Sequence, residues 1–162
     1  ETTTSAIGAS VVRLAQDPEL VELLASQPDK CNNFAEEILR HESPVQGLFR
    51  MTTEDVEIGG TTIPQGSLVN LRYGSANRDE NKYECPAEFN VDRKNASSHL
   101  AFGAGIHHCI GAQLARREIA IAVRELTTRL KDIRLVDPDT LSHTPSVILR
   151  GLNEFEIEFS ER

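Results

Sequence analysis

The most informative stretch of the chain is residues 102–111, which read Phe-Gly-Ala-Gly-Ile-His-His-Cys-Ile-Gly. Its three glycines allow the backbone to approach another group closely. Cys109 lies directly before a long amphipathic segment, and the amino end of a helix favours a thiolate through its dipole and its free N–H groups. The sequence therefore predicts that a thiolate forms and is used at Cys109.

Several kinds of site use a cysteine in such a loop. A dinucleotide-binding loop is disfavoured because its pattern requires glycine where His108 stands. Zinc is disfavoured because His107, His108 and Cys109 are contiguous, whereas zinc ligands are usually separated along the chain. A cysteine nucleophile needs a base that faces it, so His99 or His143 would have to serve. An inert buried cysteine and an axial thiolate ligand of haem are the other interpretations, and residue chemistry leaves these three open.

Composition describes an ordinary globular protein. The chain has 162 residues, of which 39% are hydrophobic and 26% charged, enough for one domain with a sizeable core. Its net charge of −8 argues against nucleic acid as a partner. No apolar run is long enough to cross a membrane, and the first residues do not look like a signal peptide. The cysteines, Cys31, Cys85 and Cys109, fit neither a disulfide framework nor a zinc ribbon and indicate the cytoplasm.

Hydrophobic periodicity predicts an α+β chain that is mainly helical, in a single domain 1–162. Three helices are expected in 1–43, a small antiparallel sheet in 47–73 and an irregular loop in 77–98. The loop around Cys109 and the longest helix are expected in 99–130, and β-hairpins in 132–162. The predicted apolar side of the long helix, which we expect to run from about Cys109 to Leu130, consists of Ile110, Leu114, Ile119, Val123, Leu126 and Leu130.

Three motifs in order resemble those of the cytochrome P450 family. Residues 102–111 match every fixed position of its haem-binding loop, and Glu37-Ile-Leu-Arg40 resembles its E-x-x-R helix motif. The segment 41–47 resembles the one that follows that helix. The resemblance implies the carboxy-terminal part of the cytochrome P450 fold, with Glu37 and Arg40 as a buried structural pair. Glu88 stands where the family often has arginine, and Arg93 is the candidate substitute.

The resemblance also implies a haem site. Cys109 would be the axial thiolate ligand of haem b, iron protoporphyrin IX, and Arg50, His99 and His107 would bind its propionates. Glu1 and Thr2 resemble the acid–alcohol pair of the distal helix, with Glu1 as the carboxylate of a proton relay and Thr2 as the hydroxyl beside dioxygen. The implied cofactor-binding residues are Arg50, His99, Phe102, Gly103, His107, Cys109 and Gly111.

Pocket and partner residues follow from the same resemblance. Val45, Leu48 and Val147 would border an apolar substrate pocket. Arg116 and Arg117 would receive a ferredoxin or ferredoxin reductase-type electron donor, although a solvated helix face explains these arginines almost as well.

The implied activity is that of a bacterial, cytoplasmic haem-thiolate monooxygenase. Such an enzyme inserts one oxygen atom of O2 into an unactivated C–H bond of a small apolar organic substrate. Members of the family are considerably longer, so residues 1–162 are expected to form a single partial domain that begins inside the distal helix and lacks an amino-terminal part. The alternatives are a truncated, non-catalytic haem-binding or remnant module and, last, a cysteine hydrolase.

Overall fold

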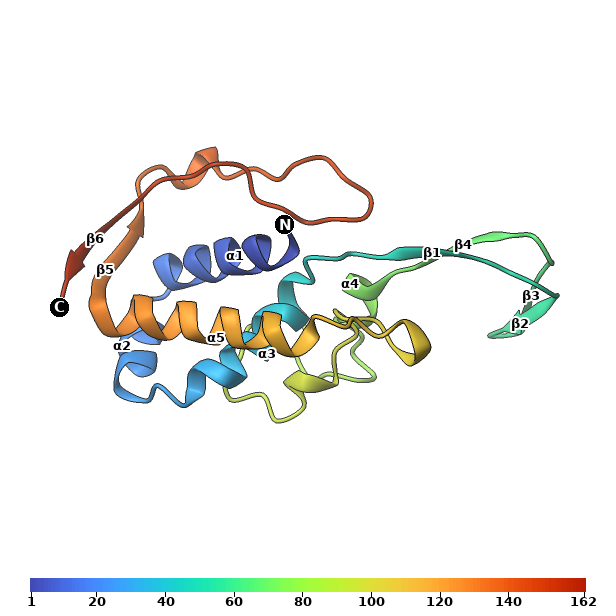
Figure 1. Cartoon of the computed structure of the whole chain (residues 1–162), viewed down its shortest axis with the longest axis horizontal. Coiled ribbons are helices and arrows are strands. Elements are labelled where there is room, and N and C mark those ends of the chain that lie inside the picture. The colour runs from blue at the N-terminus through green and yellow to red at the C-terminus, as the bar shows by residue number, and fades with distance from the viewer.

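Four helices form the body of the protein in the computed structural model, which describes residues 1–162. They are α1 (Thr2–Gln16), α2 (Pro18–Ser26), α3 (Lys30–Glu42) and α5 (Ala112–Arg129). The helices α1, α2 and α3 all pack against α5, and α1 and α5 run side by side in Figure 1. No helix is both long and apolar enough to span a membrane.

Local chemistry sets the ends of the first three helices. The Asp17 side chain accepts a hydrogen bond from the Leu20 N–H at 3.0 Å and caps α2, with Pro18 in the first turn, where a missing N–H costs nothing. The helix α3 ends at Ser43, which takes a left-handed φ of 45° immediately before Pro44. Three helices therefore precede the first strand, as the periodicity indicates.

The core lies between α1, α2, α3 and α5. The long helix differs from expectation at its amino end: it begins at Ala112, because Gly105–His107 form a 3-10 turn and the Cys109 N–H bonds to the Phe102 carbonyl instead. As a result Ile110 lies before the helix and is fully exposed, and Leu114 is 62% exposed, so these two members of the predicted apolar side do not pack in the core. The largest fully buried apolar side chains are Phe34, Leu14, Leu24, Ile38, Ile119 and Val123.

Residues 48–71, which we call the arm, form two separate two-stranded sheets rather than one sheet. Strand β1 (Leu48–Met51) pairs antiparallel with β4 (Leu68–Leu71), and β2 (Val56–Ile58) pairs with β3 (Thr61–Ile63) in a separate two-stranded sheet. Figure 1 shows the two pairs in succession, extending away from the helices. The strands β2 and β3 are joined by Gly59 and Gly60, whose φ values of 57° and 76° suit a tight hairpin turn.

Short elements connect the arm to α5. A single turn of helix, α4 (Tyr73–Ala76), follows β4, and the irregular stretch after it contains the 3-10 turn η1 (Ala96–Ser98). After α5, β5 (Leu130–Leu135) pairs antiparallel with β6 (Ile157–Glu161), and the 3-10 turn η3 (Pro138–Thr140) lies between them. Mixed helices and small antiparallel sheets confirm the α+β class.

The tail between β5 and β6 crosses back to the segment after α3. The predicted β-hairpins of 132–162 are only partly present, since the stretch 147–150 forms no strand and only an isolated bridge, between Val45 and Leu149. The Gln46 N–H donates to the Ile148 carbonyl at 2.7 Å, and the Arg150 N–H donates to the Pro44 carbonyl at 2.9 Å. The tail is thereby fixed beside residues 44–46.

An ion pair attaches the tail to the end of α3. Arg150 Nε donates to Glu42 Oε2 at 3.0 Å, and His41 Nδ1 lies 2.8 Å from Glu42 Oε1. Burial raises the pKa of the Glu42 carboxyl, but hydrogen bonds from His41 and Arg150 outweigh burial and lower the pKa from 4.5 to about 2. Glu42 is therefore charged over the whole physiological range.

Acid is expected to weaken this attachment in a defined pH range. Because the pKa of Glu42 is lower in the folded than in the unfolded chain, its charge stabilises the fold above pH 4.5, and that contribution is lost as the pH falls towards about 2. We expect Glu42→Gln to lower the free energy of unfolding by on the order of 2 kcal/mol at neutral pH. Near pH 2 the variant and the parent chain should differ little, as measured by urea titration.

A matched control separates this effect from the loss of any surface charge. Glu158→Gln removes the exposed ion pair with Arg134 and should change stability little at either pH. Equal losses for Glu42→Gln at neutral and acid pH would show that ionisation of Glu42 is not the cause.

Candidate functional site

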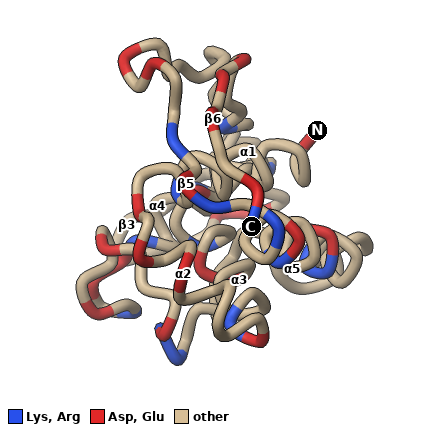
Figure 2. The backbone as a smooth tube through the Cα atoms, turned by 90° about the vertical axis from the view of Figure 1, so that its left-hand side faces the viewer, with Lys and Arg blue, Asp and Glu red and all other residues tan.

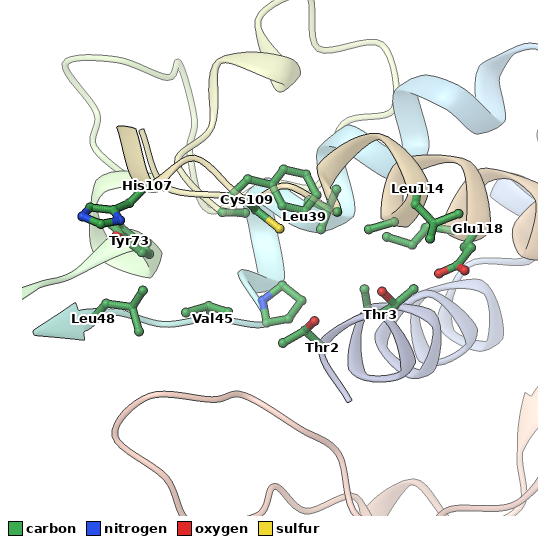
Figure 3. Close-up of a pocket in the computed structure, with 18 residues that line it drawn as sticks. Thr2, Thr3, Leu39, Val45, Leu48, Tyr73, His107, Cys109, Leu114 and Glu118 are labelled. Atoms are coloured by element: carbon green, nitrogen blue, oxygen red, sulfur yellow. The ribbon is translucent and has the colours of Figure 1, made fainter. Parts of the chain in front are cut away.

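A cavity of about 390 Å³ lies between the start of α1, the segment after α3, the loop 101–111 and the start of α5. Its wall is mainly apolar, with 11 hydrophobic residues among the 18 that line it. Figure 3 shows the sulfur of Cys109 directed into the space between its loop and the start of α1. A thiol donor thus faces an apolar chamber of the size that small-molecule sites have.

Glycine conformations shape the loop that carries Cys109. Gly103 and Gly105 both have a φ of 69°, a left-handed conformation that other residues rarely adopt. The Cys109 N–H donates to the Phe102 carbonyl at 2.9 Å, which folds the loop back on itself. At Gly103 an added Cβ would also approach the Tyr73 hydroxyl to 3.5 Å. The loop therefore needs glycine for its backbone and presents the thiol at its end.

The start of α1 forms the wall opposite the loop. Thr2 and Thr3 line the cavity, and Figure 3 shows both at the first turn of the helix. Glu1 precedes the helix, its side chain caps nothing, and it is not among the lining residues. The structure therefore brings Thr2, but not Glu1, to the cavity wall.

Most of the other predicted site residues converge on this cavity. Arg50 is exposed on β1, two residues after Leu48 and hence on the same strand face, with its guanidinium donating to the Phe49 carbonyl at 2.8 Å. Arg50 does not line the cavity, whereas Leu48 does. The predicted residues that do line the cavity, with Thr2, are Val45, Leu48, Phe102, Gly103, His107, Cys109 and Gly111.

His99 is a correction to the sequence prediction. Its side chain is fully buried away from the cavity, with Nε2 at 3.1 Å from Glu36 Oε2. Its Nδ1 accepts the Ala101 N–H at 3.2 Å. Both ring nitrogens are thus already engaged within the protein, so His99 has no donor left for a cofactor. Sequence spacing near the loop does not reveal in which direction the ring points.

Val147 and Arg116 also differ from expectation. Val147 is 65% exposed and does not line the cavity, because the tail meets the segment 44–46 through Ile148 and Arg150. Arg116 donates from Nε to Glu36 Oε1 at 2.6 Å and is only 21% exposed, so it is not a free surface cation. Arg117 is exposed on α5 and has no ion pair within 4.0 Å.

The Glu37–Arg40 pair is buried and supports the loop 77–98. Both side chains have no exposed surface, and two hydrogen bonds of 2.7 and 2.8 Å join the guanidinium to the carboxylate. Arg93 adds a third contact, from its Nε to Glu37 Oε1 at 3.1 Å, so it is the third partner of the pair. Burial by itself would raise the pKa of the Glu37 carboxyl. The hydrogen bonds from Arg40, the Asn90 N–H and Arg93 outweigh burial, so the pKa is lowered. The carboxylate therefore stays charged inside the fold.

The cysteine hydrolase interpretation needs a histidine next to Cys109. No hydrogen bond joins Cys109 to a histidine side chain: His99 bonds to Glu36, and His143 lies on the tail, where it bridges to Leu152. The arrangement does not provide the nucleophile–base contact that such chemistry uses.

Some residues of the wall were missed from sequence. Leu114 and Glu118 lie one helical turn apart on α5 and face the cavity in Figure 3. Their spacing from each other, shortly after the Cys109 loop, could have indicated this face. The other missed lining residues, including Leu39, Pro44 and Tyr73, carry no signal in the sequence.

Comparisons with known proteins identify the family. The family model described as Cytochrome P450 matches residues 31–158. Cytochrome P450 107B1 of Saccharopolyspora erythraea is 43% identical over 159 residues, covering 97% of this chain and 39% of that protein. The Beta-dihydromenaquinone-9 omega-hydroxylase of Mycobacterium tuberculosis is 43% identical over 162 residues, covering 100% of this chain and 32% of that protein.

A solved structure agrees with these relatives. Cytochrome P450 CYP109Q5 from Chondromyces apiculatus superposes with a TM-score of 0.93 at 40% identity, over 100% of this chain and 42% of that one. The chain thus spans about two fifths or less of the length of the proteins that it matches. Family match, sequence identity and superposition agree with the motifs around Cys109 and Glu37, and the chain belongs to the cytochrome P450 family.

Proposed function

We propose that this chain contributes the thiolate side of a haem monooxygenase that inserts one oxygen atom of O2 into a C–H bond of a small apolar organic molecule. The observation that carries the proposal is the Cys109 thiol, which faces an apolar cavity whose opposite wall bears the Thr2 hydroxyl. Membership of the cytochrome P450 family supports it. The whole reaction belongs to the longer proteins of which this chain matches a part.

The residues of the cavity fit haem b. A flat apolar macrocycle needs apolar walls, a close approach of backbone and one axial donor. Phe102 and Leu39 supply apolar wall, and Cys109 forms no disulfide. Gly111 leaves space beside the thiol, since an added Cβ there would lie 3.9 Å from Cys109 Sγ. Cys109 would therefore hold the iron.

The propionates need cations or N–H donors. His107 lines the cavity and is exposed, and Arg50 is on the face of β1 that also carries Leu48, a lining residue. A guanidinium or an imidazole N–H opposite a carboxylate gives the strong, charge-assisted hydrogen bond that such groups form. Arg50 and His107 would serve, and His99 is excluded by its contacts with Glu36 and Ala101.

Bound haem supplies the activation of dioxygen, and a thiolate ligand favours cleavage of the O–O bond. The protein's part is to deliver protons on the side opposite Cys109. The Thr2 hydroxyl, on the cavity wall, would hold and pass a proton, and Glu1, outside the wall and exposed, would resupply it.

The surroundings of the cavity support a class of substrate and a contact residue for the electron donor. Val45 and Leu48 give it an apolar wall, which suits a small apolar substrate. For a ferredoxin or ferredoxin reductase-type donor we propose Arg117 as the contact, since Arg116 is held by Glu36. Figure 2 shows acidic and basic residues interspersed around α5, so such docking would be local. A cytoplasmic location accords with the three free cysteines.

A second candidate is haem binding without turnover. It is favoured by Ile106 and Ile110, which flank Cys109 and are 97% and 105% exposed. Large apolar side chains beside a cofactor site are normally covered, and an uncovered site admits water and holds a cofactor less firmly.

Haem titration of the purified chain tests the proposal. We expect one equivalent of haem to bind, and the reduced sample treated with CO to show the red-shifted Soret band of a thiolate ligand. A Soret band without that shift, or no binding at all, would contradict thiolate ligation. Oxygenated product from an apolar probe, formed with a ferredoxin and its reductase, separates the enzyme from the non-catalytic module.

A further inference from the structure

The α3 residue next to the buried ion pair has a separate set of partners. Glu36 precedes Glu37, and its two carboxylate oxygens bind different donors: Oε1 accepts from Arg116 Nε at 2.6 Å, and Oε2 accepts from His99 Nε2 at 3.1 Å. The side chain of Glu36 is 17% exposed and that of His99 has no exposed surface. Glu36 therefore joins α3 to a residue before the Cys109 loop and to a residue after it.

The direction of the His99 bond follows from its second nitrogen. Because Nδ1 accepts the Ala101 N–H at 3.2 Å, the ring proton is on Nε2 and is donated to Glu36. Burial raises the pKa of Glu36, but the hydrogen bonds from His99 and Arg116 outweigh burial, so its pKa is lowered. A charged carboxylate thus receives one donor on each oxygen.

Arg116 carries this attachment to the loop itself. Its guanidinium carbon lies 4.6 Å from the centroid of the Phe102 ring, within the range of a cation–π contact. The carbonyl of Phe102 accepts the Cys109 N–H at 2.9 Å, and Phe102 also lines the cavity. A continuous set of contacts therefore runs from Glu36 through Arg116 and Phe102 to the backbone of Cys109.

We propose that Glu36 is a positioning residue for the Cys109 loop, which it holds at both ends through His99 and Arg116. The link to haem rests on the proposed function, but the restraint on the loop does not. Glu36 touches neither the cavity nor Cys109 and acts only through its partners. Neither contact is local, since Glu36 is 63 residues from His99 and 80 from Arg116.

Substitutions at Glu36 distinguish charge pairing from simple packing. Glu36→Gln keeps the size of the side chain, but its amide has one acceptor oxygen and an NH2 group, which would face one of the two donors. It therefore loses at least one contact and leaves a buried donor unpaired. Glu36→Asp keeps both acceptor oxygens on a shorter side chain and should partly restore the loop.

The first measurement needs no haem. The exchange rate of the Cys109 amide, followed by NMR, reports the bond to the Phe102 carbonyl. We expect Glu36→Gln to raise it roughly tenfold, Glu36→Asp to raise it less, and the Leu14 amide in the core to be unchanged in both. Glu22→Gln is the matched control, since it removes the 2.6 Å ion pair with Arg162 far from the loop.

The second measurement is haem affinity. Substituting a residue that contacts and orients a metal ligand, without touching the metal, typically weakens metal affinity by about 10- to 100-fold. We expect Glu36→Gln to weaken haem binding within that range and to lose part of the thiolate-type CO spectrum, with Glu22→Gln unchanged.

Amide exchange tests the positioning role of Glu36, and haem binding by the parent chain tests the proposed function, so each proposal can be overturned without the other. A folded Glu36→Gln chain whose Cys109 amide exchanges as slowly as in the parent chain overturns the positioning role. If Glu36→Gln does not fold, Arg116→Gln breaks the same contact from the α5 side and is judged by the same exchange rate. If the parent chain binds no haem, the proposed function fails, and amide exchange still decides the role of Glu36.

Discussion

Cys109→Ser is expected to abolish the red-shifted Soret band of the haem-loaded, reduced and CO-treated chain. A serine hydroxyl has nearly the same shape as a thiol but does not ionise near neutral pH, so it cannot provide the electron-rich ligand behind that band. Cys109 is the only cysteine that lines the cavity, since Cys31 is buried among the helices and Cys85 is exposed on the loop 77–98. No other thiol can replace it without refolding.

Cys85→Ser is the matched control for this substitution. Cys85 has a φ of 44° and lies away from the cavity, so the same change there should leave the spectrum intact. A Cys109→Ser chain that keeps the thiolate-type spectrum would show that the ligand is assigned to the wrong residue. Absorption spectra of the three chains under identical haem and CO conditions provide the comparison.

Glu37→Ala is expected to cause the largest loss of stability of any single substitution considered. Arg40 would keep its guanidinium fully buried with bonds only to the carbonyls of Asn77, Pro86 and Glu88, and its charge would have no counterion. Removing one partner of a buried ion pair typically costs about 3–5 kcal/mol. Because domains are stable by only about 5–15 kcal/mol, this loss is a large fraction of the total stability, and the variant should unfold at a much lower urea concentration.

Urea titration of Glu37→Ala measures this loss against an exposed pair. Glu158→Ala breaks the ion pair with Arg134, in which the two side chains are 54% and 67% exposed, and should cost less than about 1 kcal/mol. If both substitutions cost the same, the Glu37–Arg40 pair does not carry the stability assigned to it. The difference between the two variants is the informative quantity, because both remove one carboxylate from an ion pair.

Much of the fold was predictable because its signals are local. Asp17-Pro18 and Ser43-Pro44 end or begin helices through their own backbone chemistry, and Gly59-Gly60 turns a hairpin in the same way. The long helix was predicted to begin too early because Ile110 and Leu114 continue its apolar period. In the structure the 3-10 turn and the bond from Cys109 to Phe102 delay the helix, and both side chains stay outside the core.

In the candidate site too, the features that the sequence predicted are local, and those that it missed depend on distant segments. The loop around Cys109 and the resemblance to the cytochrome P450 family rest on residues that are close in sequence, and the family comparison confirms the family. The places of His99, Val147 and Arg116 rest on contacts with distant segments, and for each the sequence prediction was wrong or incomplete. The Glu36 contacts, which span 63 and 80 residues, had no sequence signal at all.

The sequence by itself therefore determined the family, the helices and the cysteine that faces the cavity, because these depend on backbone preferences and on short motifs. The tertiary structure places Thr2, Val45 and Leu48 on one cavity with Cys109, as the resemblance implies. It alone decided that His99 and Arg116 are both bound by Glu36. The physical reason is that a side chain acquires its partners only when helices and loops pack together. Packing brings together residues that are far apart in the sequence, and their spacing in the sequence does not indicate the contact.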